Sequence, residues 1–337
     1  MTLLRHLLAG ALAAASWATA SDVAGDEPPE SAAPLTWGIV PSGPEGPGDR
    51  GAFDFVLDPG ASRTDVVAVA NYSERPLTLT VYAHDAVRST NGGFDLLPAA
   101  KEPIEVGSWV VLDETPLTVP ARSRVDVPFR IRVPANATPG DHAGGIVASL
   151  ATEPGGLSSG EVTVDRRVGA RIYVRVSGTL DPRLDVTDVH ASFSGLPVGA
   201  PGEIRVDYTV RNTGNVRLSG RPTVRVAGPF GLGAREVTGE LLPELLPGDS
   251  VTTSAVVDGV WPLVRLDVDV TVQPESSGDQ LLEPPPASGS AGGHVWAVPW
   301  VVLAVLGALV LAVVVRLRRR RRSRRPTSAS TSESAAA

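Results

Sequence analysis

Near its C-terminus the chain carries twenty consecutive uncharged residues, Trp296–Val315, and these run directly into an arginine-rich tail. At about 1.5 Å per residue, a helix of this length spans roughly 30 Å, the thickness of the hydrocarbon core of a bilayer. Trp296 and Trp300 lie at its start, where indole rings favour the membrane interface. We therefore expect one transmembrane helix over residues 296–315.

The two ends of the chain predict how such a helix is oriented. The tail, residues 316–337, holds eight Arg, and each would cost about 2.5–3.5 kcal/mol at the membrane centre, so we expect the tail to be cytoplasmic. Residues 1–20 are typical of a secretory signal peptide, with Arg5 and His6 before the apolar run Leu7–Ala15 and a small-residue cleavage site, Ala18-Thr19-Ala20. A disordered acidic and Pro-containing linker, residues 21–34, follows. These features predict a single-pass plasma-membrane protein with its N-terminal ectodomain outside.

Charge and composition exclude several classes of function for the exported part. Of the net charge of −7, the tail contributes +7 and the leader +1, which leaves −15 on the rest of the chain. So acidic a surface argues against nucleic-acid binding. The chain has no Cys, so disulfides, thiolate metal sites and Cys nucleophiles are excluded. Lys101 is the only Lys beside many Arg, which suggests a high-GC, actinobacterial source.

Between the termini the dominant pattern is alternation of apolar and polar residues with period two, and no segment predicts a helix. Such alternation is typical of antiparallel sheets with one buried face, and turn sequences such as Asp58-Pro59-Gly60 and Pro247-Gly248-Asp249 separate the strands. An all-β fold follows, with two Ig-like β-sandwiches in tandem. The alternating apolar positions are Val125, Val127, Phe129, Ile131, Val133, Ile172, Val174, Val176, Val206, Tyr208, Val210, Leu266, Val268, Val270 and Val272.

A faint internal repeat divides this region into two sandwiches. Asn71-Tyr72-Ser73 follows one strand and Asn212-Thr213-Gly214 follows another, and each is succeeded later by a Pro-led turn into a further strand. The predicted domains are residues 35–179 and 180–273. Residues 274–294, rich in Pro, Gly and Ser, are expected to be a linker. Pro128 within a strand predicts an edge or bulge.

Several short strings resemble functional motifs, and we interpret each as structural. Gly46–Gly51 matches a dinucleotide fingerprint, but a strand rather than a helix is expected after it. Gly156–Gly160 matches a nucleophile elbow in what reads as a hairpin loop. His84, His142 and His190 lack metal-ligand spacing, and Asp267 and Asp269 share a strand face expected to be solvated. We therefore expect no catalytic residues, no metal site and no cofactor. The glycosylation strings Asn71-Tyr72-Ser73 and Asn136-Ala137-Thr138 are interpreted as turns.

Residues 35–179 resemble the peptidoglycan-binding domain of the WxL-interacting proteins of Gram-positive bacteria. The resemblance is carried by Phe53-Asp54-Phe55, Pro59-Gly60, Val69-Ala70-Asn71-Tyr72-Ser73, Ala86–Gly93, Val119–Ser123 and Val133-Pro134 through Pro139–Ile146. The overall plan of signal, two β domains, one membrane helix and basic tail is also similar to that family, although residues 181–274 show only generic sandwich features. The resemblance implies a non-enzymatic surface protein that contacts peptidoglycan and assembles with other surface proteins.

The sequence leaves three functional hypotheses. The first is a wall-facing protein that binds peptidoglycan, a partner surface protein, or both. The second is an assembly factor, because the Asn-turn-strand pattern also resembles pilus chaperones that add a strand to a client. The third, an enzyme, has no supporting motif. Since sugar rings stack on aromatic side chains, the candidate ligand-binding residues are Trp37, Tyr72, Tyr82 and Trp109.

Overall fold

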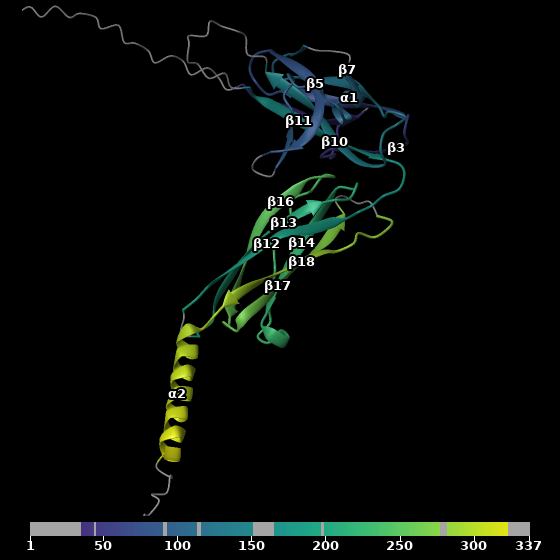
Figure 1. Cartoon of the computed structure of the whole chain (residues 1–337). Coiled ribbons are helices and arrows are strands. Elements are labelled where there is room, and N and C mark those ends of the chain that lie inside the picture. The colour runs from purple at the N-terminus through teal and green to yellow at the C-terminus, as the bar shows by residue number, and fades with distance from the viewer. Residues whose placement is uncertain are drawn as a thin grey trace, which may run out of the picture. The chain divides into compact units, whose positions relative to one another are not determined.

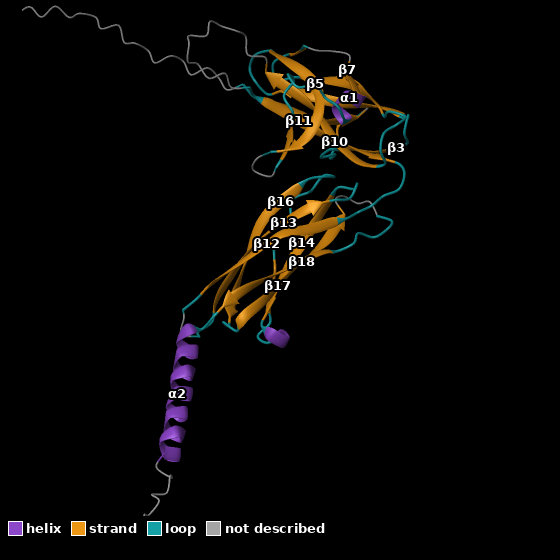
Figure 2. Ribbon diagram, in the orientation of Figure 1, coloured by secondary structure: helices purple, strands orange, loops and turns teal. Residues whose placement is uncertain are grey.

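The computed structural model describes residues 35–43, 45–89, 93–112, 116–150, 165–196, 199–276 and 282–322. Strands make up most of this part of the chain, as Figure 2 shows, which confirms the predicted all-β fold. The predicted signal peptide, the acidic linker, the string at residues 156–160 and the tail beyond Arg322 lie outside the described residues.

The first sandwich contains one sheet with the strand order β2-β1-β4-β9-β7, in which all neighbours are antiparallel. Figure 1 labels strand β7 of this sheet. Along β9, Val127, Phe129 and Ile131 are buried while their neighbours are exposed, as the alternation predicted. Strand β9 lies between β4 and β7, and Pro128 is opposite Val66 of β4, next to the three residues of β9 that pair with β7. The strands are β1 (Trp37–Gly43), β2 (Gly46–Pro47), β4 (Ser62–Asn71), β7 (Val110–Leu112) and β9 (Arg124–Arg132).

The opposing sheet has the order β3-β11-β10-β5-β6, and β8 also pairs with β5. Strand β3 runs parallel to β11, whereas the other pairs are antiparallel. The fully buried Phe53 of β3 meets Phe129 of β9 edge to face, with ring centroids 4.9 Å apart, and so joins the two sheets. The strands are β3 (Phe53–Leu57), β5 (Leu77–Arg88), β6 (Phe94–Leu96), β8 (Leu117–Val119), β10 (Gly140–Leu150) and β11 (Arg167–Val176).

A short helix, α1 (Val106–Trp109), interrupts the first sandwich and corrects the expectation that no helix lies between the termini. The carboxylate of Asp85 accepts hydrogen bonds from the backbone N–H groups of Ile104, Glu105 and Gly107, so a distant strand residue holds this turn. A Cβ at Gly107 would lie only 2.6 Å from the His84 backbone, so the turn requires glycine there. No local periodicity reveals a helix of one turn held in this way.

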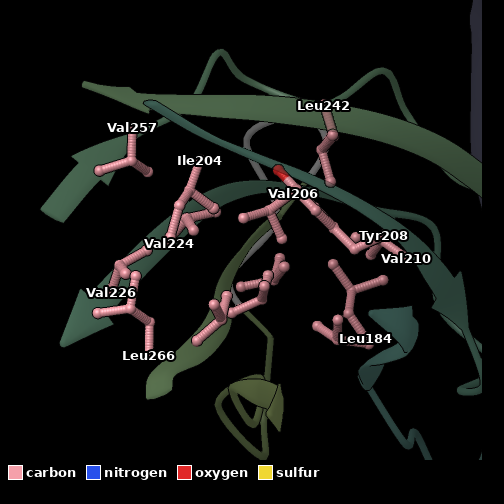
Figure 3. Close-up of a cluster of buried hydrophobic side chains, with 14 of the residues drawn as sticks. Leu184, Ile204, Val206, Tyr208, Val210, Val224, Val226, Leu242, Val257 and Leu266 are labelled. Carbon is pink, nitrogen blue, oxygen red and sulfur yellow. The ribbon is translucent and has the colours of Figure 1, made fainter. Parts of the chain in front are cut away.

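The second sandwich consists of a sheet β12-β13-β16 facing a sheet β15-β14-β17-β18. Its core is formed by Val, Leu and Ile side chains around the buried Tyr208 (Figure 3). Val206, Tyr208 and Val210 of β13 point inward, as do Leu266 to Val272 of β17 at every second position, as predicted. The strands are β12 (Leu184–Ser194), β13 (Gly202–Asn212), β14 (Leu218–Ala227), β15 (Arg235–Thr238), β16 (Ser250–Val260), β17 (Val264–Ser276) and β18 (Gly289–Ala297); η1 (Pro229–Gly231) is a 3₁₀ turn.

Strand β18 corrects the expected linker over residues 274–294. Residues 289–297 pair with β17 over nine positions, and Ala297 is almost fully buried in the second core. The sequence of this segment predicts a linker because glycine has low strand propensity, and the segment contains Gly289, Gly292 and Gly293. A Cβ at Gly289 would lie 2.1 Å from the Leu184 carbonyl oxygen, so close packing against β12 requires at least this glycine.

The predicted apolar helix is present as α2 (Trp300–Arg322). An 18-residue window within Trp300–Arg320 has a mean hydropathy of 2.7, and among the described residues this is the one helix whose length and composition would allow it to cross a membrane. It begins four residues later than expected, because Trp296 belongs to β18 and Pro299 precedes the first helical residue.

Candidate functional site

The four predicted aromatic residues do not form one cluster. Trp37 and Trp109 are 8% and 6% exposed and belong to the core, so their rings are not available to stack on a sugar. The Trp37 Nε1–H donates to the Ala148 carbonyl at 3.0 Å, and the Trp109 ring centroid lies 4.8 Å from that of His142. Tyr82 is half-buried on β5. Tyr72, by contrast, is 64% exposed, so it is the one of the four predicted residues whose side chain is largely at the surface.

Tyr72 lies directly after β4, on a turn fixed by the buried Asn71. The Asn71 Nδ2 group donates to the carbonyl oxygens of Arg75, Val119 and Pro120 at 2.8–3.1 Å, and its Oδ1 accepts the Ser73 N–H at 2.8 Å. Asn212 makes the equivalent bonds in the second sandwich, to Val216, Leu245 and Gly214. The predicted repeat therefore has a common physical basis, in which a buried Asn side chain ties its own turn to a distant segment.

Further hydrogen bonds hold the backbone around Tyr72. The Tyr72 N–H donates to the Thr36 carbonyl at 2.9 Å, and the Asn71 N–H donates to the Ser123 carbonyl at 2.8 Å. The Thr36 N–H donates in turn to the Ser73 hydroxyl at 2.8 Å. Turn 71–73 is thus joined both to the segment before β1 and to turn 120–123. A side chain carried on a turn bonded on both sides loses little conformational freedom when it binds a ligand.

The Tyr72 ring lies against the start of β1, where Gly38 provides the space. A Cβ at Gly38 would lie 3.3 Å from Tyr72 Cε2 and 3.8 Å from Cζ. Across the sheet, Gly38 pairs with Ala70, which pairs with Arg124, and Val40 pairs with Ala68. Small residues on two adjacent strands, Gly38 on β1 and Ala68 and Ala70 on β4, therefore leave a depression beside the ring.

This depression, which we call the Tyr72 hollow, has a volume of about 640 Å³. Such a volume is within the roughly 300–1,000 Å³ of typical ligand sites. Ala68 and Ala70 contribute small side chains from β4, and two arginines border the hollow. Its lining comprises Val40, Pro47, Ala68, Ala70, Asn71, Tyr72, Arg122, Ser123 and Arg124.

Each of the two arginines at the hollow is paired with a carboxylate. Arg122 forms a two-pronged salt bridge with Glu74, in which Nε donates to Oε2 at 2.9 Å. This hydrogen bond holds the pKa of Glu74 below its usual range and raises the pKa of Arg122. Arg124 Nε lies 3.4 Å from Asp126 Oδ1, an atom that also accepts the Ser42 hydroxyl at 3.2 Å. The hollow thus offers N–H donors with little net charge.

Of the residues that line the hollow, Tyr72 alone is expected from the sequence to bind a ligand. Arg122 has a φ of +48°, a left-handed conformation that a residue other than glycine rarely adopts. The Arg122 N–H donates to the Ser73 carbonyl at 3.1 Å, so turn 71–73 helps to hold this conformation. The string Pro120-Ala121-Arg122-Ser123 marked a turn, but no signal in it indicates the left-handed residue.

The residues of the other sequence motifs belong to strands or make contacts that stabilise the fold. Gly46 and Pro47 form the short strand β2, with no helix after them. His84 Nε2 contacts the Lys101 carbonyl at 2.8 Å, and His142 Nδ1 contacts Glu105 at 2.7 Å. Within the described residues no group of three or more His, Asp or Glu could hold a metal ion. Asp267 lies on an exposed strand face beside Arg265.

Comparison with known families gives one match, to the family described as WxL Interacting Protein, peptidoglycan binding domain, over residues 47–149. This match confirms the resemblance stated from the sequence for that part of the chain. The matched segment begins at the end of β2 and ends within β10, so it contains Tyr72, Arg122 and Arg124. No curated protein matches the chain.

Among solved structures the chain is similar to proteins of fimbrial assembly. A chaperone–tip adhesin complex of CFA/I fimbriae biogenesis is 13% identical with a TM-score of 0.38, covering 78% of this chain and 99% of that chain. The class 5 fimbriae chaperone CfaA is 14% identical with a TM-score of 0.37, covering 78% and 100%. The Pseudomonas aeruginosa CupB2 chaperone is 11% identical with a TM-score of 0.30, covering 74% and 99%. Scores this low support no functional inference.

Proposed function

We propose that this is a membrane-anchored, non-enzymatic surface protein whose first sandwich binds peptidoglycan. The observation that carries the proposal is the family match over residues 47–149. The Tyr72 hollow supports it, because an exposed aromatic ring on a rigid turn, bordered by N–H donors, is suited to a carbohydrate. The surface around it offers recognition groups rather than a paired acid and base.

The proposed topology places both sandwiches outside the cell and the basic tail in the cytoplasm. The apolar helix and the Arg residues that follow it support this orientation through the positive-inside rule. Only Val298 and Pro299 separate the end of β18 from the start of α2. Two residues reach about 7 Å at most, so the second sandwich would be attached at the membrane surface without a flexible stalk.

Cosedimentation tests the proposed function. The full chain in detergent micelles is mixed with purified insoluble peptidoglycan, and the pelleted fraction is measured. We expect the chain to pellet with peptidoglycan and to remain soluble with insoluble cellulose, which lacks N-acetyl and lactyl groups. Equal recovery with both particles, or recovery with neither, would contradict peptidoglycan binding.

A second candidate function is assembly support by strand addition, and a feature of the second sandwich favours it. Strand β16 is at the edge of its sheet, and no described strand pairs with its outer side. Beside it is a hollow of about 440 Å³ lined by Val237, Leu241, Val251 and Ala255 among others. An unpaired edge next to apolar side chains can accept an extended segment from a partner.

Hydrogen exchange distinguishes this second candidate. If a surface protein adds a strand, the amides of β16 exchange more slowly in native membranes than in the purified chain, while those of β17, already paired on both sides, change little. Equal exchange of β16 in the two preparations would argue against strand addition.

A further inference from the structure

We propose that the Tyr72 hollow binds the glycan strand of peptidoglycan, through an N-acetylated sugar, and does not bind its stem peptides. This inference rests on the proposed function and adds to it the ligand chemistry and the binding residues. Peptidoglycan offers two chemically different faces, a carbohydrate chain with acetamido groups and short peptides with free carboxylates. The surface around Tyr72 discriminates between them.

The aromatic ring supplies the surface on which a sugar can stack. Tyr72 is 64% exposed, yet the position of its backbone is fixed by Asn71, Thr36 and Ser123. Sugar rings present C–H groups on one face, which pack favourably on an aromatic ring. Ordering an exposed residue on binding costs conformational entropy, and the hydrogen-bonded turn removes the main-chain part of that cost for Tyr72.

The charge of the hollow argues for a neutral ligand group. Arg122 is already paired with Glu74, and Arg124 with Asp126, so the charge of each guanidinium is largely neutralised and a stem-peptide carboxylate gains little electrostatic attraction there. The net charge of −15 on the exported part also repels anionic ligands.

The pairing leaves donors available for the carbonyl of an acetamido group. An arginine side chain has five N–H donors, and a two-pronged salt bridge uses two of them. In Arg122 the Glu74 bridge occupies Nε and one N–H of Nη2, so Nη1 is not part of that bridge. Arg124 carries Nη1 and Nη2 over Gly46, at the side of the hollow near Pro47.

The shape of the hollow is consistent with a sugar in a chain rather than a chain end. The hollow is an open depression along the outer face of β1, β4 and β9, with small side chains at Gly38, Ala68 and Ala70. A strand of linked sugars can continue past such a depression on both sides. A closed pocket would instead select a terminus.

Calorimetric titration of the full chain tests this inference with two probes from one amidase digest, peptide-free glycan strands and the released stem peptides. We expect binding to the glycan strands and none to the stem peptides. Tyr72→Ala should weaken glycan binding by about tenfold, or about 1.4 kcal/mol, whereas Tyr72→Phe keeps the ring and should retain it. Raising NaCl from about 50 to about 300 mM should change the affinity by less than about twofold, because the site has little net charge.

Two variants serve as matched controls. Phe230→Ala removes a fully exposed aromatic ring from the second sandwich, and Arg132→Gln removes an exposed arginine from the same strand as Arg124. Both should bind glycan as the parent chain does. Thermal unfolding of each variant shows whether a loss of binding reflects loss of the fold.

Three results would overturn the inference: binding of stem peptides with no binding of glycan, an unchanged affinity in folded Tyr72→Ala, or a loss of glycan binding in Tyr72→Phe equal to that in Tyr72→Ala. If the parent chain pellets with intact peptidoglycan but shows any of these, the site inference fails and the proposed function stands. If the parent chain does not pellet at all, both fail.

Discussion

At the scale of single residues, two buried asparagines hold the turns that the sequence motifs predicted. Asn71 and Asn212 are 1% and 0% exposed, and each bridges its own turn to a distant segment. The glycosylation string at Asn71 is therefore unavailable in the folded chain, because its amide is fully used inside the protein. The pattern in the sequence was sufficient to predict the turns, whereas the partner segments depend on the tertiary fold.

We predict that Asn71→Asp destabilises the first sandwich more than Asn71→Ala does. The aspartate would place a carboxylate against the carbonyl oxygens of Arg75, Val119 and Pro120. Loss of the amide alone should cost about 1–3 kcal/mol, and the unpaired buried charge should bring the loss to about 3–5 kcal/mol. Denaturant unfolding of the three chains measures the difference. Equal stability of the two variants at neutral pH would contradict the predicted cost of placing a carboxylate against these carbonyl oxygens.

Tyr208 predicts an alkaline limit to the stability of the second sandwich. Burial raises the pKa of its hydroxyl above the ordinary value of about 10. Above pH ~10 the unfolded chain loses this proton while the folded chain retains it, so the stabilisation is present below that pH and is lost as pH rises toward the folded pKa. Burial also raises the pKa of Tyr173, so Tyr208→Phe should reduce the slope without abolishing it.

Thermal unfolding of the parent chain and of Tyr208→Phe between pH ~8 and ~11 measures this effect. Identical pH dependence of the two chains would contradict it. Tyr72→Phe is a suitable control, because it removes a hydroxyl from a largely exposed residue of the first sandwich.

At the scale of elements, the strands in which apolar and polar residues alternate strictly could be predicted from the sequence. The strands that form only because a neighbouring strand offers a free edge could not. Strands β9, β13 and β17 present their apolar side chains inward as expected. Strand β18 has small and glycine residues that carry little strand signal, and it forms because β17 offers it a free edge. The Tyr72 hollow likewise could not be predicted from the sequence, because it depends on the space at Gly38 and on the left-handed backbone conformation of Arg122.

The strand assignment of β18 leads to a prediction for Ala297, which the sequence pattern placed in the transmembrane helix over residues 296–315. Ala297 is 1% exposed, so Ala297→Asp should place an unpaired carboxylate in the second core and destabilise that sandwich by several kcal/mol, about 3 or more. Limited proteolysis and thermal unfolding would report the loss. The neighbouring Trp296 is 63% exposed, so Trp296→Ala should leave stability nearly unchanged. Similar effects of both changes would contradict the packing of β18.

At the scale of the whole molecule, the proposed role rests on two features, the match of residues 47–149 to a peptidoglycan-binding-domain family and the apolar helix. The helix has no buried residues in its apolar window, as a lipid-facing segment requires. Deleting the chain from Trp300 onward should therefore release it from the membrane fraction without changing its affinity for peptidoglycan. A truncated chain that still sediments with membranes in high salt would contradict the anchoring role of α2.

Photocrosslinking from position 72 tests the central claim most directly. Tyr72 is replaced by a benzophenone amino acid in the full membrane-anchored chain, cells are irradiated, and the walls are digested with a glycan-cleaving muramidase. We expect mass spectrometry to find sugar fragments of peptidoglycan attached at position 72 and none at position 230, which is more exposed but lies in the second sandwich. Attachment of protein alone at position 72, or equal sugar attachment at both positions, would contradict the proposed glycan site.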